Sequence, residues 1–86
     1  MAMDARKPDV VREKMRTFIC HELLPRPDYP LEDDEPLMTG GLIDSFCVAH
    51  IGVFVEMEFQ VYIPDTELTV ENMDTLRQIV ARVIQG

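Results

Sequence analysis

The segment that most limits how this chain can fold follows its first apolar stretch and contains Pro25, Pro27, Pro30 and Pro36. Each proline lacks an amide donor and disfavours helical geometry in the residue before it, so a helix cannot continue through the segment. Before it, apolar side chains recur every three or four residues, which predicts a helix over residues 9–24. A loop of about twenty residues then extends to Asp44, and a loop of this length in a small domain is more often functional than incidental.

A second helix is predicted to begin at Ser45. The glycines at 40 and 41 allow a sharp turn, and the side chain of Asp44 can accept a hydrogen bond from the free amides of the new helix. Apolar residues then occupy two faces of this helix. The inner face contains Val48, Ile51, Gly52, Val55 and Phe59, and the second face contains Phe46, His50, Val53, Phe54 and Met57. One face can be buried, so the other is either covered by the loop or open to a partner.

The last third of the chain predicts two more helical segments. Residues 59–63 alternate as a strand would, but no second strand-like run exists to pair with them, so they are interpreted as the frayed end of the second helix. Residues 69–73 are expected to form one short turn, and Asp74 is predicted to cap a last helix. The expected fold is all-α: a small four-helix bundle with a long loop between its first two helices, a short third helix, and one domain over residues 1–86 with a core of about 8–84.

Size and charge exclude several classes of function. A chain of 86 residues hides only a modest core, which leaves little room for a large buried active site. The net charge is −8, and residues 28–74 contain twelve acidic residues and no Lys or Arg. Such a block repels nucleic acid and anionic lipid, and it either steers the domain toward basic partner surfaces or only keeps it soluble.

The expected location is the cytoplasm. The longest apolar stretch runs only from Ile51 to Val55, far short of the roughly 20 residues that a membrane helix needs, so no membrane insertion is expected. The N-terminal residues show no secretory signal. Cys20 and Cys47 are too few for a disulfide framework and fit a reducing compartment.

Ser45 lies where a glycine-containing loop meets a predicted helix N-terminus. Backbone amides and the helix dipole favour a bound or covalently attached phosphate at such a position. By itself, an Asp-Ser pair before an apolar run is usually only a helix cap.

The residues around Ser45 extend this signal. Gly-Leu-Ile-Asp-Ser-Phe at 41–46 closely resembles the attachment motif of the acyl carrier protein family, and the likeness covers roughly residues 8–84. Further segments with family-like sequence lie at 33–37, 56–59, 63–65 and 74–76. The resemblance implies a carrier that is not an enzyme, in which a phosphopantetheinyl transferase moves 4'-phosphopantetheine from coenzyme A onto Ser45, with Asp44 as the neighbouring acid. Acyl or aminoacyl groups would then be held as thioesters on the arm.

The same resemblance implies that a monomeric carrier contacts its partners, a loading ligase and downstream transferases, through one surface. This predicted partner face contains Leu42, Phe46, His50, Val53, Phe54 and Glu56. Familiar fatty-acid carriers have a more acidic face here, whereas this helix keeps only Glu56 and Glu58. In this weakly acidic face and in residues 71–76, the sequence is more similar to free-standing aminoacyl or D-alanyl carriers, or to carriers of a specialised pathway.

Three other hypotheses explain less of the sequence. Cys20, His21, Cys47 and His50 are a conceivable zinc set, but neighbouring Cys20 and His21 diverge by roughly 100° around a helix and neither pair has ligand spacing, so no metal site is predicted. Ser45 or Cys47 beside His50 lacks an orienting group and an oxyanion site, which argues against catalysis. A helical interaction module without a prosthetic group remains the alternative.

Overall fold

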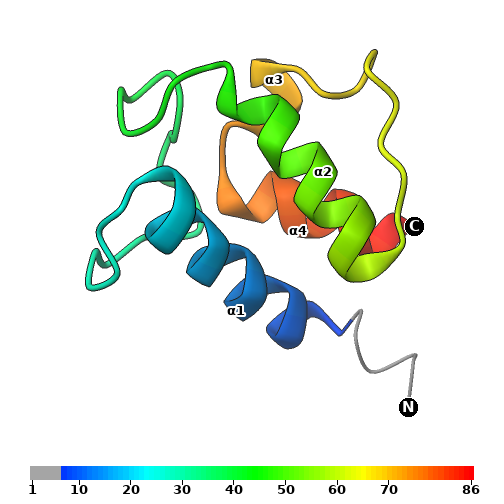
Figure 1. Cartoon of the computed structure of the whole chain (residues 1–86), viewed down its shortest axis with the longest axis horizontal. Coiled ribbons are helices and arrows are strands. Elements are labelled where there is room, and N and C mark those ends of the chain that lie inside the picture. The colour runs from blue at the N-terminus through cyan, green and yellow to red at the C-terminus, as the bar shows by residue number, and fades with distance from the viewer. Residues whose placement is uncertain (1–6) are drawn as a thin grey trace.

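The computed structural model describes residues 7–86, and these form helices and connecting loops with no β-strand among them (Figure 1). The first helix consists of α1 (Pro8–Phe18), which continues directly into the π-helical turn η2 (Ile19–Leu23). The others are α2 (Cys47–Phe59), α3 (Val70–Met73) and α4 (Leu76–Gln85). The all-α prediction is therefore confirmed for the described residues, and helix 8–23 agrees closely with the predicted 9–24.

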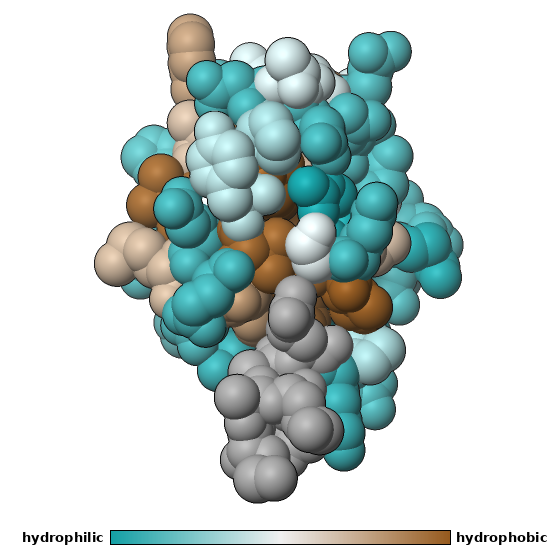
Figure 2. Space-filling view, turned by 90° about the vertical axis from the view of Figure 1, so that its right-hand side faces the viewer, coloured by the Kyte–Doolittle hydropathy of each residue, from teal (hydrophilic) through white to brown (hydrophobic). Residues whose placement is uncertain are grey.

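The core lies where α1, α2 and α4 face one another, and α1 packs directly on α4. All five residues of the predicted inner face of α2 are buried. The loop of residues 24–46 also contributes, since Leu31, Leu37 and Ile43 are buried. Figure 2 shows the side toward the right of Figure 1, where apolar residues reach the surface among mainly hydrophilic ones. No helix within residues 7–86 has the length and apolar character needed to cross a bilayer.

The start of α2 differs slightly from the prediction. Ser45 and Phe46 form a turn, and the α-helix begins at Cys47. The amides of Cys47 and Val48 donate to the carbonyl oxygens three residues back, those of Asp44 and Ser45, at 2.9 and 3.2 Å. This tighter hydrogen-bond pattern is common at helix ends. Asp44 does accept a free amide, because its Oδ1 lies 3.0 Å from the nitrogen of Phe46.

The prediction of a frayed helix end over residues 59–63 is wrong beyond Phe59. Gln60 adopts a left-handed conformation with φ of 58°, which ends α2, and its amide donates to the carbonyl oxygen of Glu56. The chain then runs extended, with Val61 and Ile63 buried and Tyr62 exposed. The alternation in the sequence therefore reflects side chains that pack on the core without a partner strand.

The sequence predicts Asp74 as the cap of α4, but Asp74 does not cap this helix. Thr75 is the cap: its hydroxyl accepts the amide of Gln78 at 3.1 Å, while the Gln78 side chain accepts the amide of Thr75. The carboxylate of Asp74 instead accepts hydrogen bonds from the amides of Met38 and Thr39, at 2.7 and 3.1 Å, and from the Thr39 hydroxyl at 2.5 Å. Asp74 therefore ties the loop to the start of α4.

Arg77, one residue into α4, binds the same loop further upstream. Its guanidinium makes two hydrogen bonds with the Asp34 carboxylate, at 2.6 and 3.0 Å, and its amide donates to the carbonyl oxygen of Asp33. Arg12 of α1 pairs with the Asp33 carboxylate at 2.6 Å. The loop is therefore attached to both α1 and α4, and these contacts fix the position at which α2 begins.

We predict that Asp74→Ala lowers the free energy of unfolding by about 1–3 kcal/mol, because it leaves loop amides without their acceptor. Partial burial raises the pKa of Asp74, but the hydrogen bonds from Thr39 and Met38 outweigh it and hold this pKa below the ordinary 3.8. The stability that the Asp74 charge contributes is thus complete above about pH 4 and is lost as the pH falls through the folded pKa.

Urea unfolding at pH 7 and pH 3 checks this prediction. The difference between wild type and Asp74→Asn should be larger at pH 7 than at pH 3. Asp28→Ala is the matched control, since Asp28 is an exposed loop carboxylate. Equal losses for Asp74→Ala and Asp28→Ala would contradict the role assigned to Asp74.

Candidate functional site

Ser45 lies exposed in the turn that joins the loop to α2. Among residues 7–86, its hydroxyl has one hydrogen-bond partner, Oδ1 of Asp44, at 3.5 Å, which is the long limit for such a bond. The same Asp44 oxygen accepts the amide of Phe46 at the shorter distance of 3.0 Å. The Ser45 hydroxyl is therefore open to solvent and only weakly engaged by the protein.

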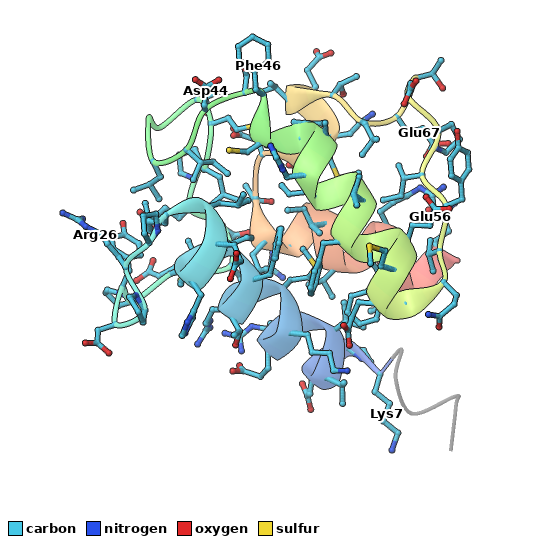
Figure 3. All side chains as sticks on the ribbon, viewed as in Figure 1. Lys7, Arg26, Asp44, Phe46, Glu56 and Glu67 are labelled. Carbon is cyan, nitrogen blue, oxygen red and sulfur yellow. The ribbon has the colours of Figure 1, made fainter. Side chains whose placement is uncertain are left out.

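Electrostatics at this junction come from α2 and from Asp44. The positive end of the helix dipole faces the turn, and the Asp44 carboxylate accepts the hydrogen bond of the Phe46 amide there. Figure 3 shows Asp44 and Phe46 together where the loop meets α2, while Glu56 lies toward the other end of the helix. An anionic group on Ser45 would thus meet both the favourable helix end and one fixed carboxylate.

A shallow hollow of about 270 Å³ adjoins Ser45. Its lining contains Ser45, Phe46, Val48, Ala49, Asp65 and Leu68. Leu68 comes close to α2 because Gly52 has no side chain: a Cβ there would lie 2.7 Å from Cδ1 of Leu68. The segment between α2 and α3 therefore forms one wall of the hollow beside Ser45.

Sequence reasoning missed Asp65 and Leu68 as residues near Ser45. The sequence marks residues 63–65 only as a segment with family-like sequence, and Leu68 belongs to no motif. One signal was available in Gly52, because a glycine within an apolar helical stripe often marks the close approach of another segment. Gly52 alone could not have shown that Leu68 is the residue that packs against it.

Most of the predicted partner face is exposed. Phe46 is 82% exposed and Val53 is 58% exposed, and both His50 and Glu56 are also exposed. Leu42 is half-buried and packs against the core. Met57, which the prediction placed on the second apolar face, is 75% exposed.

Phe54 differs from the rest of this set. It is half-buried, its ring stacks on Phe18 of α1 with centroids 4.1 Å apart, and it meets Phe59 edge-on at 6.1 Å. Its contribution to a partner surface is therefore limited to its exposed part, and most of its contacts belong to the packing between α1 and α2.

The conceivable zinc ligands are not assembled. Cys20 is buried with its thiol directed at the carbonyl oxygen of Tyr29, and burial raises the pKa of this thiol. On α2, Cys47 is half-buried against the core and His50 is exposed. Within residues 7–86, no three His, Cys, Asp or Glu side chains are grouped so that they could hold a metal ion.

No protein-family model matches this sequence, and the search of curated proteins found no match either. The function is therefore inferred from the residues around Ser45.

The packing of Phe54 generates a prediction that separates it from its neighbour Val53. Phe54→Ala should lower the free energy of unfolding by about 2–3 kcal/mol, somewhat less than for a fully buried phenylalanine, because it removes the contacts with Phe18 and Phe59. Val53→Asp should change it by less than about 1 kcal/mol, because Val53 is mainly in water. Urea denaturation followed by circular dichroism measures both, and a larger loss for Val53→Asp than for Phe54→Ala would refute this division.

Proposed function

We propose that this chain is a carrier protein in which Ser45 holds a 4'-phosphopantetheine arm, and that the arm carries an acyl or aminoacyl group between enzymes. The observation that carries the proposal is the setting of Ser45, the only serine in the chain, in an exposed turn within the Gly-Leu-Ile-Asp-Ser-Phe segment. The proposal includes the finer description of the fold as a carrier-type four-helix bundle, whose long loop leads to the attachment site.

The residues present at the site fit such an arm. The Ser45 hydroxyl is exposed and weakly bonded, so a transferase can reach it without unfolding the chain. The hollow beside it gives the first part of an attached arm a mainly apolar surface to lie against. When bound, the arm supplies a terminal thiol that holds the group as a thioester.

Asp44 and the loop have distinct tasks in this proposal. Asp44 holds the turn by accepting the Phe46 amide, which keeps the Ser45 side chain outside α2. Its contact with the Ser45 hydroxyl is long, and in this proposal the transferase supplies the base that activates this hydroxyl. Asp74 and Arg77 hold the loop on α4 and thereby fix the place from which Ser45 is presented.

The surroundings of Ser45 also favour protein partners of basic character. The acidic block of residues 28–74 would attract a basic transferase or ligase surface and repel nucleic acid. The proposed partners are therefore a phosphopantetheinyl transferase, a loading ligase and downstream transferases, and the proposed setting is a single-domain monomer in the cytoplasm. The second candidate is an interaction module without an arm, which the exposed Phe46 and Met57 would serve equally well.

We predict that the wild-type chain gains one arm when incubated with coenzyme A, magnesium and a broad-specificity phosphopantetheinyl transferase, and that Ser45→Ala gains none. Intact mass measures the gain, and circular dichroism should show the same helical content in both proteins because Asp44 still holds the turn. Thr66→Ala is the matched control, since it removes another exposed hydroxyl and should leave the modification unchanged. A wild-type chain that gains no mass would favour the interaction module.

The cargo is expected to be an amino acid or a specialised acyl group, and not a long fatty acyl chain. The exposed part of α2 presents Val53 and Met57 with few carboxylates, which suits a different partner from that of a strongly acidic carrier. Purification with its natural partner enzymes, followed by thioester cleavage and mass analysis of the released group, tests this. Recovery mainly of long saturated or 3-hydroxy fatty acids would disprove the cargo prediction and leave the arm on Ser45 unaffected.

A further inference from the structure

Leu68 fills a slot in the side of α2, next to the hollow at Ser45. A Cβ atom at Gly52 would lie 2.7 and 3.1 Å from the two methyl carbons of Leu68, well inside the roughly 3.5–4.0 Å at which carbon atoms attract each other best. The methyl groups therefore lie directly against the backbone of α2, in the place that any other side chain at position 52 would occupy. Gly52 is buried, whereas Leu68 is half-buried and also lines the hollow.

Hydrogen bonds and an ion pair fix the segment that contains Leu68. The amide of Leu68 donates to the carbonyl oxygen of Pro64 at 3.1 Å. The preceding residue, Glu67, pairs with Arg82 of α4 at 2.6 Å, and its carbonyl oxygen accepts the side chain of Asn72 in α3 at 3.3 Å (Figure 3). Because the Arg82 side chain is only 15% exposed, solvent screens this pair less than a pair at the open surface. Leu68 is therefore a fixed wall of the hollow.

The slot lies between the hollow at Ser45 and the core. Gly52 is on the buried side of α2, between Val48 and Val55, which are both core residues. Without the Leu68 side chain, the hollow would extend along this side of the helix. With Leu68 in place it holds about 270 Å³, less than the roughly 300–1,000 Å³ of pockets that bury a small ligand.

We infer that Leu68 is a specificity-determining residue, which keeps a long apolar cargo out of the core beside α2. This inference rests on the proposed arm at Ser45 and deepens that proposal, because it names the cargo class as short or polar groups that stay at the surface. A long acyl chain on this carrier either displaces Leu68, against the contacts of Glu67, or stays in water, which is unfavourable for its methylene groups.

Chain length is the variable that tests this inference. Acetyl, hexanoyl and decanoyl groups are attached to Ser45 of the full-length chain with a phosphopantetheinyl transferase and amide analogues of acyl-coenzyme A, whose amide bond survives heating. Intact mass verifies the loading. The midpoint of thermal unfolding of the wild type should differ by less than about 2 °C among the three forms. In Leu68→Ala, decanoyl should raise the midpoint by about 4 °C or more relative to acetyl, because several methylene groups leave water.

Two further variants locate the effect. Leu23→Ala truncates a half-buried leucine of η2 that does not line the hollow, and its midpoint should stay independent of chain length. Gly52→Ala, added to Leu68→Ala, returns a methyl group to the slot and should reduce the gain with decanoyl. Amide shifts of the ¹⁵N-labelled chain are a second readout. Between the acetyl and decanoyl forms, the shifts of Gly52 and Val55 should change in Leu68→Ala and stay the same in the wild type.

The outcomes separate this inference from the proposed function. A wild-type chain that accepts none of the three groups contradicts the proposed function, and the role of Leu68 in cargo selection fails with it. Where loading succeeds, a decanoyl gain in the wild type as large as in Leu68→Ala, or no gain in Leu68→Ala, overturns the inference and leaves the arm at Ser45 unaffected. If Leu68→Ala does not fold, Leu68→Val takes its place, and a wild-type midpoint that rises with chain length is by itself enough to overturn the inference.

Discussion

The hydrogen bonds between Asp74 and the loop determine where Ser45 lies. A segment with four prolines cannot form a regular ladder of its own, so its remaining amides need acceptors from elsewhere. Asp74 accepts the amides of Met38 and Thr39 through its carboxylate and that of Leu37 through its carbonyl oxygen. With this support Leu37 and Ile43 enter the core, and Ser45 follows two residues after Ile43 at the surface. The exposure of Ser45 is therefore a consequence of contacts made about thirty residues later in the chain.

The apolar character of α2 on several sides has three separate explanations. Its inner face fills the core, and a second side is covered by Leu68, which Gly52 allows to approach closely. The third side contacts α1 through Phe54 and leaves Val53 and Met57 in solvent. Because these roles lie on different sides of one helix, core packing, the approach of Leu68 and the contact with α1 use different residues of α2.

Helical periodicity was enough to predict where the helices lie and which of their residues are buried. The inner face of α2 and the first helix were predicted from spacing alone, because both depend on local pattern. The cap of α4 was predicted wrongly, because Asp74 and Thr75 are both good capping residues. Only the hydrogen bonds from the loop amides to Asp74 decide between them. The half-burial of Phe54 depends on Phe18, and the extended path of residues 61–63 depends on core packing. No local pattern contains these long-range contacts.

The acidic residues of this chain have two different roles, depending on whether folding pairs them with a basic side chain. Asp33 and Asp34 are neutralised by Arg12 and Arg77, and the hydrogen bonds from Arg77 hold the pKa of Asp34 below its ordinary value. These carboxylates hold the loop, and little of their charge remains to attract a partner. Within residues 7–86, Glu22 and Glu56 have no such pairing, and both side chains are exposed. Attraction to a basic partner should therefore come mainly from the carboxylates that make no ion pair within residues 7–86, and only in part from the full net charge of −8.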